Sequence, residues 1–273
     1  MNRVSGRWKL GLLLALSTAT MWGILPVALK GVMTTLDPLT VTFFRFALAA
    51  ILLAPYLLAT GRLSGFTQLL SPSLCAQLLL AGLLLACNYG LYIIGLDKTT
   101  SEAAQVMIQI APMLLLVAGI WLFKESFSRL QWVGFFSFVC GLVLFFSHRI
   151  GDLFVAFNDY GMGMLLVIVA AVCWTGYAII QKFLLRQFSS QQTMLIFYII
   201  GALVFLLFSD FEPVSQLSQW QWLLLAFCGF NTLIAYGCFA EALVHLEASR
   251  VSAVIALTPL LTVVIVQLIP IGG

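Results

Sequence analysis

Residues 89–114 read YGLYIIGLDKTTSEAAQVMIQIAPML, and they align without gaps on residues 236–261, which read YGCFAEALVHLEASRVSAVIALTPLL. The two stretches share a Tyr-Gly pair at their start and a proline near their end, Pro112 in the first and Pro259 in the second. Unrelated apolar stretches rarely keep such residues in one ungapped register. The chain therefore contains an internal repeat, and this repeat decides the fold we expect.

A shorter match lies nearer the start of each copy. It relates TATMWGILPVALK, residues 18–30, to AVCWTGYAIIQK, residues 171–182. In this register Trp22 falls on Trp174, and a lysine ends both stretches. The first four apolar segments of the chain thus match its last four.

The composition indicates a membrane protein. Of the 273 residues, 62% are hydrophobic and only 8% are charged, and the mean hydropathy is +1.09. Soluble domains carry about 25% charged residues, so the lipid bilayer is the expected surroundings of this chain. The formal net charge of +3 is too small to suggest a nucleic-acid partner.

Nine apolar segments are long enough to cross a membrane as helices, because about 20 apolar residues match the hydrocarbon thickness. They cover roughly 10–33, 38–60, 74–96, 101–123, 130–147, 161–181, 192–209, 222–244 and 251–270. The expected fold class is an all-α polytopic membrane protein.

The distribution of basic residues predicts the orientation. With the N-terminus in the cytoplasm, nine Lys and Arg residues fall on the cytoplasmic side, and only Lys30, Lys98 and Arg149 fall outside. The nine are Arg3, Arg7, Lys9, Arg62, Lys124, Arg129, Lys182, Arg186 and Arg250. Because basic residues concentrate on the cytoplasmic side, we expect a multi-pass protein of the inner (plasma) membrane with a cytoplasmic N-terminus.

The repeat divides the chain into residues 1–147, a periplasmic linker at 148–160, and residues 161–273. Each repeat should hold five spans, an odd number, so the second copy enters the membrane from the opposite side. Inverted repeats of this kind are typical of secondary transporters. The partner of segment 130–147 would lie beyond Gly273, so we expect a tenth helix that a truncation has removed; the alternatives are that this helix was lost or is supplied separately.

Four motifs resemble the drug/metabolite transporter (DMT) superfamily, and specifically proteins with two EamA domains. They are MWG at 21–23, DPLTVTFFRFALAA at 37–50, QIAPMLLLVAGIWLFKES at 109–126 with Glu125 after the helix, and LQWVGFFSFVCGLVL at 130–144. The resemblance implies a ten-helix inner-membrane carrier that moves small metabolites, often outward. No second counterpart of Glu125 is present.

Polar and aromatic residues inside the spans are candidates for substrate binding, because they are costly in lipid and usually face a bundle interior. The candidates are Trp22, Asn88, Tyr92, Gln105, Gln109, Trp174, Tyr177 and Asn231. The alternative for the glutamines is hydrogen bonding between helices. The alternative for the tryptophans is the interfacial belt, which their depth within the spans fits poorly.

Residues that weaken a helix suggest hinges. Gly23 and Pro26 lie in the first span, and Pro112 and Pro259 lie in the fourth and ninth. A proline removes a backbone donor and loosens the helix, and neighbouring groups then satisfy the freed carbonyl.

Two charged residues lie within spans. Arg45 could act as the counter-ion of a substrate carboxylate, or could form a structural pair or extend to the outer face. Its equivalent in the second half is Phe197, so its role is not duplicated. Burial raises the pKa of a carboxyl group, so Glu241 could couple transport to protons, although it could also reach the headgroups.

No catalytic, phosphate-binding or metal-binding motif is found, and the six cysteines form no CxxC pair. We therefore expect no enzyme activity, no metal and no cofactor. The expected partners are a small-molecule substrate and the bilayer, and Gly134 and Gly141 leave a smooth face that would allow a homodimer. The preferred function is an exporter of small metabolites such as amino acids. A proton-coupled carrier of drugs or lipid-like molecules, or a non-transporting scaffold, is the alternative.

Overall fold

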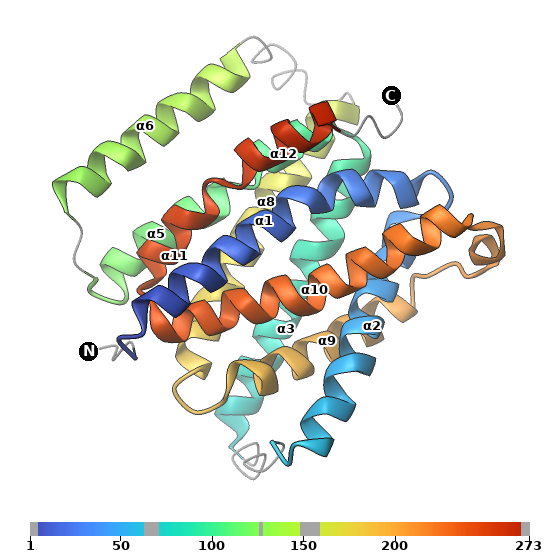
Figure 1. Ribbon diagram of the computed structural model, residues 1–273, viewed down its shortest axis with the longest axis horizontal. Coiled ribbons are helices and arrows are strands. Elements are labelled where there is room, and N and C mark those ends of the chain that lie inside the picture. The colour runs from blue at the N-terminus through green and yellow to red at the C-terminus, as the bar shows by residue number, and fades with distance from the viewer. Residues whose placement is uncertain (1–4, 63–70, 126–127, 148–158, 269–273) are drawn as a thin grey trace.

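The computed structural model describes residues 5–62, 71–125, 128–147 and 159–268, and over these residues the chain is helical with no strand (Figure 1). The helices are α1 (Trp8–Met33), α2 (Pro38–Ala59), α3 (Pro72–Asp97), α4 (Ser101–Met107), α5 (Ile110–Trp121), α6 (Arg129–Phe146), α8 (Asp159–Leu184), α9 (Ser190–Leu206), the 3-10 turn η3 (Glu212–Gln216), α10 (Gln219–His245), α11 (Ala248–Ile255) and α12 (Thr258–Leu268).

The helices account for all nine predicted spans. Seven helical segments are long and apolar enough to cross a membrane, with α4 and α5 counted as one segment and α11 and α12 as another. Two shorter apolar helices, Trp132–Phe145 and Ser190–Leu206, complete the set. The predicted fold class, an all-α polytopic membrane protein, is confirmed.

Local sequence signals fix where several helices begin. The Asp37 carboxylate accepts hydrogen bonds from the backbone N–H groups of Leu39 and Thr40, at 2.9 and 3.0 Å, and Pro38 occupies the first turn of α2. Ser189 and Ser218 form capping boxes at the starts of α9 and α10. These side chains satisfy N–H groups that a helix leaves unpaired, so the ends of α2, α9 and α10 are well defined.

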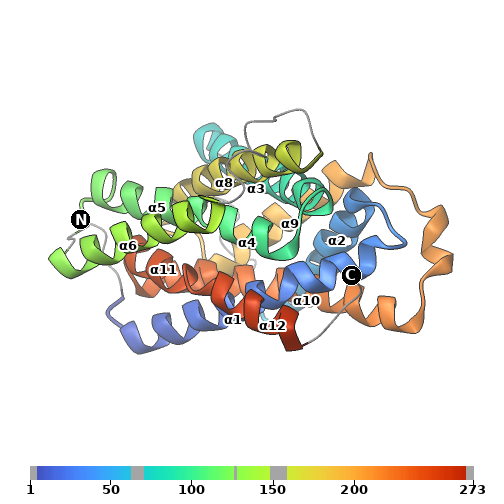
Figure 2. The ribbon, with the colours of Figure 1, turned by 90° about the horizontal axis from the view of Figure 1, so that it is seen from above.

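Each main contact between helices of the two halves has a repeat-related counterpart. Helix α1 packs on α10, and its repeat counterpart α8 packs on α3, the counterpart of α10. Helices α2 and α9, which are counterparts of each other, also pack together. Figure 2 shows α3 and α8 in one layer and α1 and α10 in the facing layer, with α2 and α9 between them. The repeat found in the sequence therefore corresponds to a repeated packing arrangement.

The fourth and ninth spans are both interrupted near the prolines at which we expected hinges. The helix breaks between α4 and α5 at residues 108–109 and between α11 and α12 at residues 256–257. Pro112 and Pro259 then lie in the first turns of α5 and α12, where a missing N–H costs little. The Thr258 hydroxyl donates to the Ile255 carbonyl at 2.6 Å, which satisfies an oxygen released by the break.

Helix α1, in contrast, continues unbroken through Gly23 and Pro26. A side chain at position 23 would put its Cβ 2.8 Å from the Cβ of Leu261, so the glycine permits close approach of α1 and α12. The Thr262 hydroxyl donates to the Gly23 carbonyl at 2.8 Å across this contact. The observed role of Gly23 is therefore helix packing, and the hinge role of Gly23 and Pro26 stays a prediction.

Helix α6 lies at the edge of the bundle (Figure 1). Gly134 and Gly141 line a groove between α6 and helices α5, α11 and α12, and nothing lies within 4 Å of a Cβ built on either glycine. The predicted homodimer stays a prediction. The predicted linker 148–160 lies outside the described residues except for its last two positions, which already belong to α8.

Candidate functional site

A cavity of about 70 Å³ lies between the two halves, beside the break between α4 and α5. This volume holds a few water molecules, so a larger ligand requires the walls of the cavity to move apart. The lining comes from both repeats and consists of Trp22, Leu25, Arg45, Asn88, Tyr89, Tyr92, Gln105, Ile108, Gln109, Ala111, Pro112, Trp174, Tyr236 and Ile255. The residues that the sequence alignment pairs thus meet at one place.

The aromatic wall of the cavity is built from repeat-related residues that touch each other. The rings of Trp22 and Trp174 lie edge to face at 5.9 Å between centroids, and those of Tyr89 and Tyr236 lie 5.2 Å apart. The ring of Trp22 also packs on that of Tyr236 at 4.9 Å. Aromatic pairs in such geometries stabilise a fixed arrangement, so these contacts hold the rings of the wall in place.

The break between α4 and α5 supplies the polar wall. The Tyr92 hydroxyl donates to Gln105 Oε1 at 3.1 Å, and Gln109 Nε2 donates to the Gln105 carbonyl at 3.3 Å. Three buried polar atoms of lining residues have no protein partner: Trp22 Nε1, the Tyr89 hydroxyl oxygen and Gln109 Oε1. An unsatisfied buried polar atom costs about 1–3 kcal/mol, so one donor, one acceptor and one hydroxyl remain for a ligand.

The structure separates the predicted binding residues into two groups. Trp22, Asn88, Tyr92, Gln105, Gln109 and Trp174 line the cavity. Tyr177 and Asn231 do not: the Tyr177 hydroxyl donates to the Met194 sulfur at 3.4 Å, and Asn231 Nδ2 donates to the Met21 carbonyl at 2.5 Å. We expected both side chains at the substrate site, and each of them instead joins two helices.

Asn88 lines the cavity and also joins helices. Its Nδ2 donates to the Ala170 carbonyl at 2.9 Å, which links α3 to α8. At the repeat-related contact the Thr18 hydroxyl donates to the Ala235 carbonyl at 3.1 Å and links α1 to α10. Ala235 is the repeat equivalent of Asn88, so the same helix contact is bonded twice with the side-chain donor on opposite helices.

Arg45 reaches the cavity from α2 and is only 2% exposed. Its Nε donates to the Thr232 hydroxyl at 3.2 Å, and its guanidinium carbon lies 4.4 Å from the centre of the Tyr89 ring. Within the described part of the chain no carboxylate forms an ion pair with it. Its repeat equivalent, Phe197, is buried and packs on Tyr177.

Glu241 lies away from this cavity. It lines a separate groove between α2, α9 and α10, where its carboxylate accepts a hydrogen bond from the Ser190 hydroxyl. Its other oxygen lies 3.4 Å from His245 Nε2, and the side chain is 40% exposed. Any coupling through Glu241 would therefore act at a distance from the central cavity.

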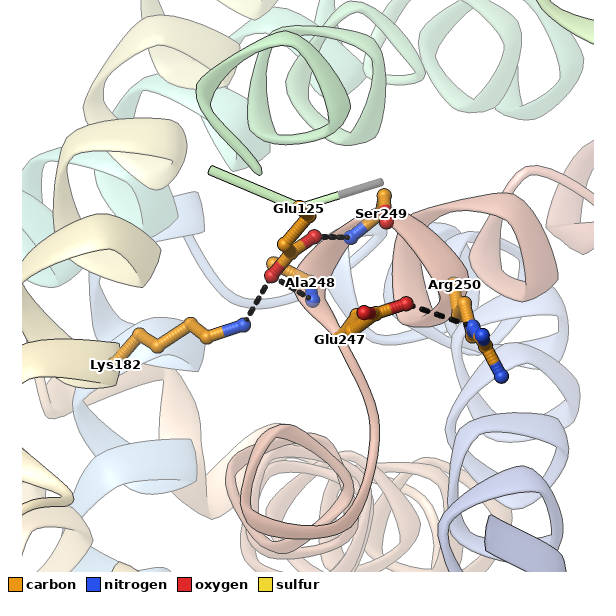
Figure 3. A network of polar contacts seen from close by, with 6 residues as sticks. All are labelled: Glu125, Lys182, Glu247, Ala248, Ser249 and Arg250. Atoms are coloured by element: carbon orange, nitrogen blue, oxygen red, sulfur yellow. Dashed lines mark hydrogen bonds and ion pairs between the residues drawn. The ribbon is translucent and has the colours of Figure 1, made fainter. Parts of the chain in front are cut away.

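A buried ion pair lies beside the start of α11, at the end of the bundle where α1 begins, since Gly11 packs against His245 and Leu246. Figure 3 shows its contacts. Lys182 Nζ lies 2.6 Å from Glu125 Oε1, and each side chain is 4% exposed. The same carboxylate accepts the backbone N–H groups of Ala248 and Ser249, both at 2.9 Å, and so caps the start of α11. Glu125 thus joins α5, α8 and α11 in one contact.

This network holds the charge on Glu125. Burial by itself raises the pKa of the Glu125 carboxyl, but the Lys182 ammonium and the two backbone donors of α11 more than offset this effect. The pKa of Glu125 therefore lies below its ordinary value of 4.5.

Sequence reasoning missed this network and the two tyrosines that the aromatic wall of the cavity shares between the repeats. Lys182 was counted as a basic residue at the end of a span, and Glu125 entered only as part of a family motif. Tyr89 and Tyr236 marked the repeat but were not assigned to the site. Their identity in both copies, at the level of the paired prolines, was the available signal.

A polytopic helical bundle with a polar and aromatic cavity between two related halves defines the class of membrane transporters. The comparisons with known proteins identify the family. Residues 9–147 and 161–269 each match the EamA-like transporter family, and the chain belongs to this family. It is a multi-pass protein of the inner membrane.

Similar proteins agree with this assignment. The chain is 36% identical to an uncharacterized inner membrane transporter, YhbE, of Escherichia coli (strain K12), over 93% of this chain and 79% of that protein. It is also 36% identical to an uncharacterized transporter of Haemophilus influenzae, over 93% of this chain and 82% of that protein. A protein of known crystal structure aligns with a TM-score of 0.71 over 97% of this chain and 90% of that one; at 16% identity this shows a shared fold alone.

Proposed function

We propose that this protein is a secondary transporter that moves small metabolites such as amino acids outward across the inner membrane. The observation that carries the proposal is the central cavity, which is lined by both halves and contains unpaired polar atoms beside a broken helix. An amino acid offers a carboxylate, an ammonium group and an apolar side chain, which suit Arg45, the Gln109 oxygen and the aromatic wall. The outward direction follows from the family resemblance.

Alternating access is the mechanism that the repeat supports. Five spans in each copy would invert the second half relative to the first, so the two halves can exchange conformations and open the cavity to each side in turn. The exchanged packing pairs and the two broken spans are the structural counterparts of this scheme. Because of the breaks, α4 can change its orientation independently of α5, and α11 independently of α12.

The buried contact of Glu125 would then act as the cytoplasmic closure. With the N-terminus in the cytoplasm, as the basic residues predict, this contact lies at the cytoplasmic end of the bundle. It ties the end of α5, in the first half, to α8 and α11 in the second. Opening the cavity to the cytoplasm requires this contact to break.

The cavity argues against the alternatives. A proton-coupled carrier of cationic drugs needs a membrane-embedded acid at its site, whereas the ionised side chain of this cavity is Arg45 and Glu241 lies elsewhere. A scaffold needs neither a cavity nor unpaired polar atoms inside it.

Counterflow in proteoliposomes tests the proposal. Purified protein should accumulate labelled amino acids from a panel against an internal pool, and empty liposomes should not. Gln109→Leu keeps the side-chain volume but removes the unpaired amide oxygen, so we expect uptake to fall by about tenfold or more. Gln77→Leu, on α3 outside the cavity lining, is the matched control. No accumulation of any compound by the wild-type protein would overturn the proposal.

A further inference from the structure

Arg45 is a buried cation without an anion. Burying a charge is costly unless it is paired, and proteins normally supply a carboxylate partner. Among the described residues, the partners of the Arg45 guanidinium are a hydroxyl and an aromatic face. Both are neutral, so the positive charge is held in place and not neutralised.

The arrangement fixes the orientation of the guanidinium. Thr232 takes the Nε–H, and Thr232 is itself held because its hydroxyl donates to the Cys228 carbonyl at 3.0 Å. The Tyr89 ring covers one face of the guanidinium plane. The N–H groups on the two terminal nitrogens form a planar fork suited to two oxygens of one group.

We propose that the central cavity selects substrates that carry a carboxylate, which pairs with Arg45, and rejects cations and uncharged analogues. The inference rests on the proposed function and narrows its substrate class. The aromatic wall of Trp22, Trp174 and Tyr236 receives the apolar body of the substrate. An ammonium group is accepted beside the carboxylate but is not required.

The charge of the lining supports a single carboxylate over other ligands. Arg45 is the lone ionised side chain among the lining residues, all of which lie in the described part of the chain. A net cation would be repelled by the guanidinium in a site with little water. A doubly charged phosphate would bring one negative charge more than the lining neutralises.

Binding to the purified full chain in nanodiscs tests the inference, with thermal shift as the readout. The probes are matched pairs of a carboxylate and its amide: 3-phenylpropionate, L-phenylalanine, L-tryptophan and L-leucine, each against its amide. We expect at least one wild-type carboxylate to bind about tenfold or more tightly than its amide, since hydrogen bonds to charged groups are strong. Arg45→Gln should abolish this preference.

The control is Arg62→Gln, which removes an exposed arginine outside the cavity that bonds to Tyr56 and Gln191. It should keep the preference for carboxylates. If Arg45→Gln does not fold, Thr232→Val decides the test, because it frees the guanidinium and should weaken carboxylates several-fold while leaving amides unchanged.

Equal affinity for acids and amides, binding of no carboxylate at all, or a preference that survives Arg45→Gln would overturn the inference. These outcomes are separate from the proposed function. A wild-type protein that carries the amides as well as the acids would remain a transporter with a different selectivity. One that binds carboxylates but moves none would keep the selective site and lose the transport function.

Discussion

The two repeats place a lysine at equivalent positions near opposite ends of the bundle, and the two lysines are held differently. Lys182 is buried and pairs with the Glu125 carboxylate. Lys30 is half-buried, and its ammonium donates to the backbone carbonyls of Thr99 and Asp97 at 2.6 and 3.4 Å. Both contacts lie next to the start of a short helix, α11 in one case and α4 in the other.

The starts of these short helices differ in the same way. At α4 the local residue Thr100 accepts the Ala103 N–H at 3.2 Å. At α11 the local residue Glu247 makes no side-chain cap, and Glu125 from the other half does so instead. One end of the bundle therefore has a buried contact between the two halves, and the other has partly exposed bonds within the first half that water can replace. We infer that the two ends open at different cost.

Replacing each lysine tests most directly whether the two contacts differ in strength. Lys182→Met leaves the Glu125 carboxylate buried without its cation, which typically costs about 3–5 kcal/mol. Lys30→Met removes hydrogen bonds from an ammonium group to neutral carbonyls at a half-buried site and should cost less, about 1.5–3 kcal/mol. Unfolding titrations in mixed micelles measure both variants. Equal losses would show that the two ends are fastened equally, and a double Glu125→Leu/Lys182→Met variant should lose less than Lys182→Met alone.

Acid should weaken the Glu125 end selectively. The pKa of Glu125 lies below its ordinary value of 4.5, so its stabilisation is complete above about pH 5 and is lost as the pH falls through the lowered pKa. The difference in unfolding temperature between wild-type protein and Glu125→Gln should thus stay constant from pH 7 to about 5 and shrink below that. A difference that grows towards acid pH would contradict the assigned network.

The repeat-related helices α1 and α8 also differ in how closely a glycine lets a neighbouring helix approach. In Gly23→Ala the new Cβ would lie 2.8 Å from Leu261 Cβ, which cannot move without shifting α12, and we expect a loss of about 1–3 kcal/mol. In Gly176→Ala, on α8, the nearest atom is the flexible end of Leu84 at 3.1 Å, so the change should be nearly neutral. Unfolding titrations compare the two, and a neutral Gly23→Ala would show that α12 is loosely held.

The helical spans and the contacts between repeat-related residues could be predicted, because they follow from hydrophobic periodicity and from the internal repeat. The matched prolines located both broken spans, and the pairing of Trp22 with Trp174 anticipated two residues that meet in space. Helical spacing shows which residues share a face of one helix, but not which neighbouring helix that face meets. For this reason Tyr177 and Asn231 were expected to line the substrate site. Each of them instead bonds to an adjacent helix.

The contact of Glu125 was beyond sequence reasoning for a different reason. Its partners lie 57 positions away at Lys182 and more than a hundred away at Ala248. No local pattern joins a residue after one helix to the end of a second helix and the start of a third. Only the packing of α5 against both α8 and α11 brings these groups together.

The smallest contrast tests whether the packing of broken spans is equivalent in the two halves. The Thr175 hydroxyl, on α8, donates to the Ala111 carbonyl of α5 at 3.2 Å, and the Thr262 hydroxyl, on α12, donates to the Gly23 carbonyl of α1 at 2.8 Å. Each bond joins a broken span to its neighbour, but the donor lies on the continuous helix in one half and on the broken span in the other.

Hydrogen bonds between membrane helices contribute about 0.6 kcal/mol on average, so Thr175→Val and Thr262→Val should each cost about that much. Thr18→Val, which removes the bond from α1 to the Ala235 carbonyl, is the control away from the broken spans. Unfolding titrations give the stabilities, and counterflow gives the rates. If the broken spans move during transport, the first two variants should change the rate of counterflow while Thr18→Val leaves it unchanged at a similar loss of stability. Equal rates in all three would mean that these contacts persist through the cycle.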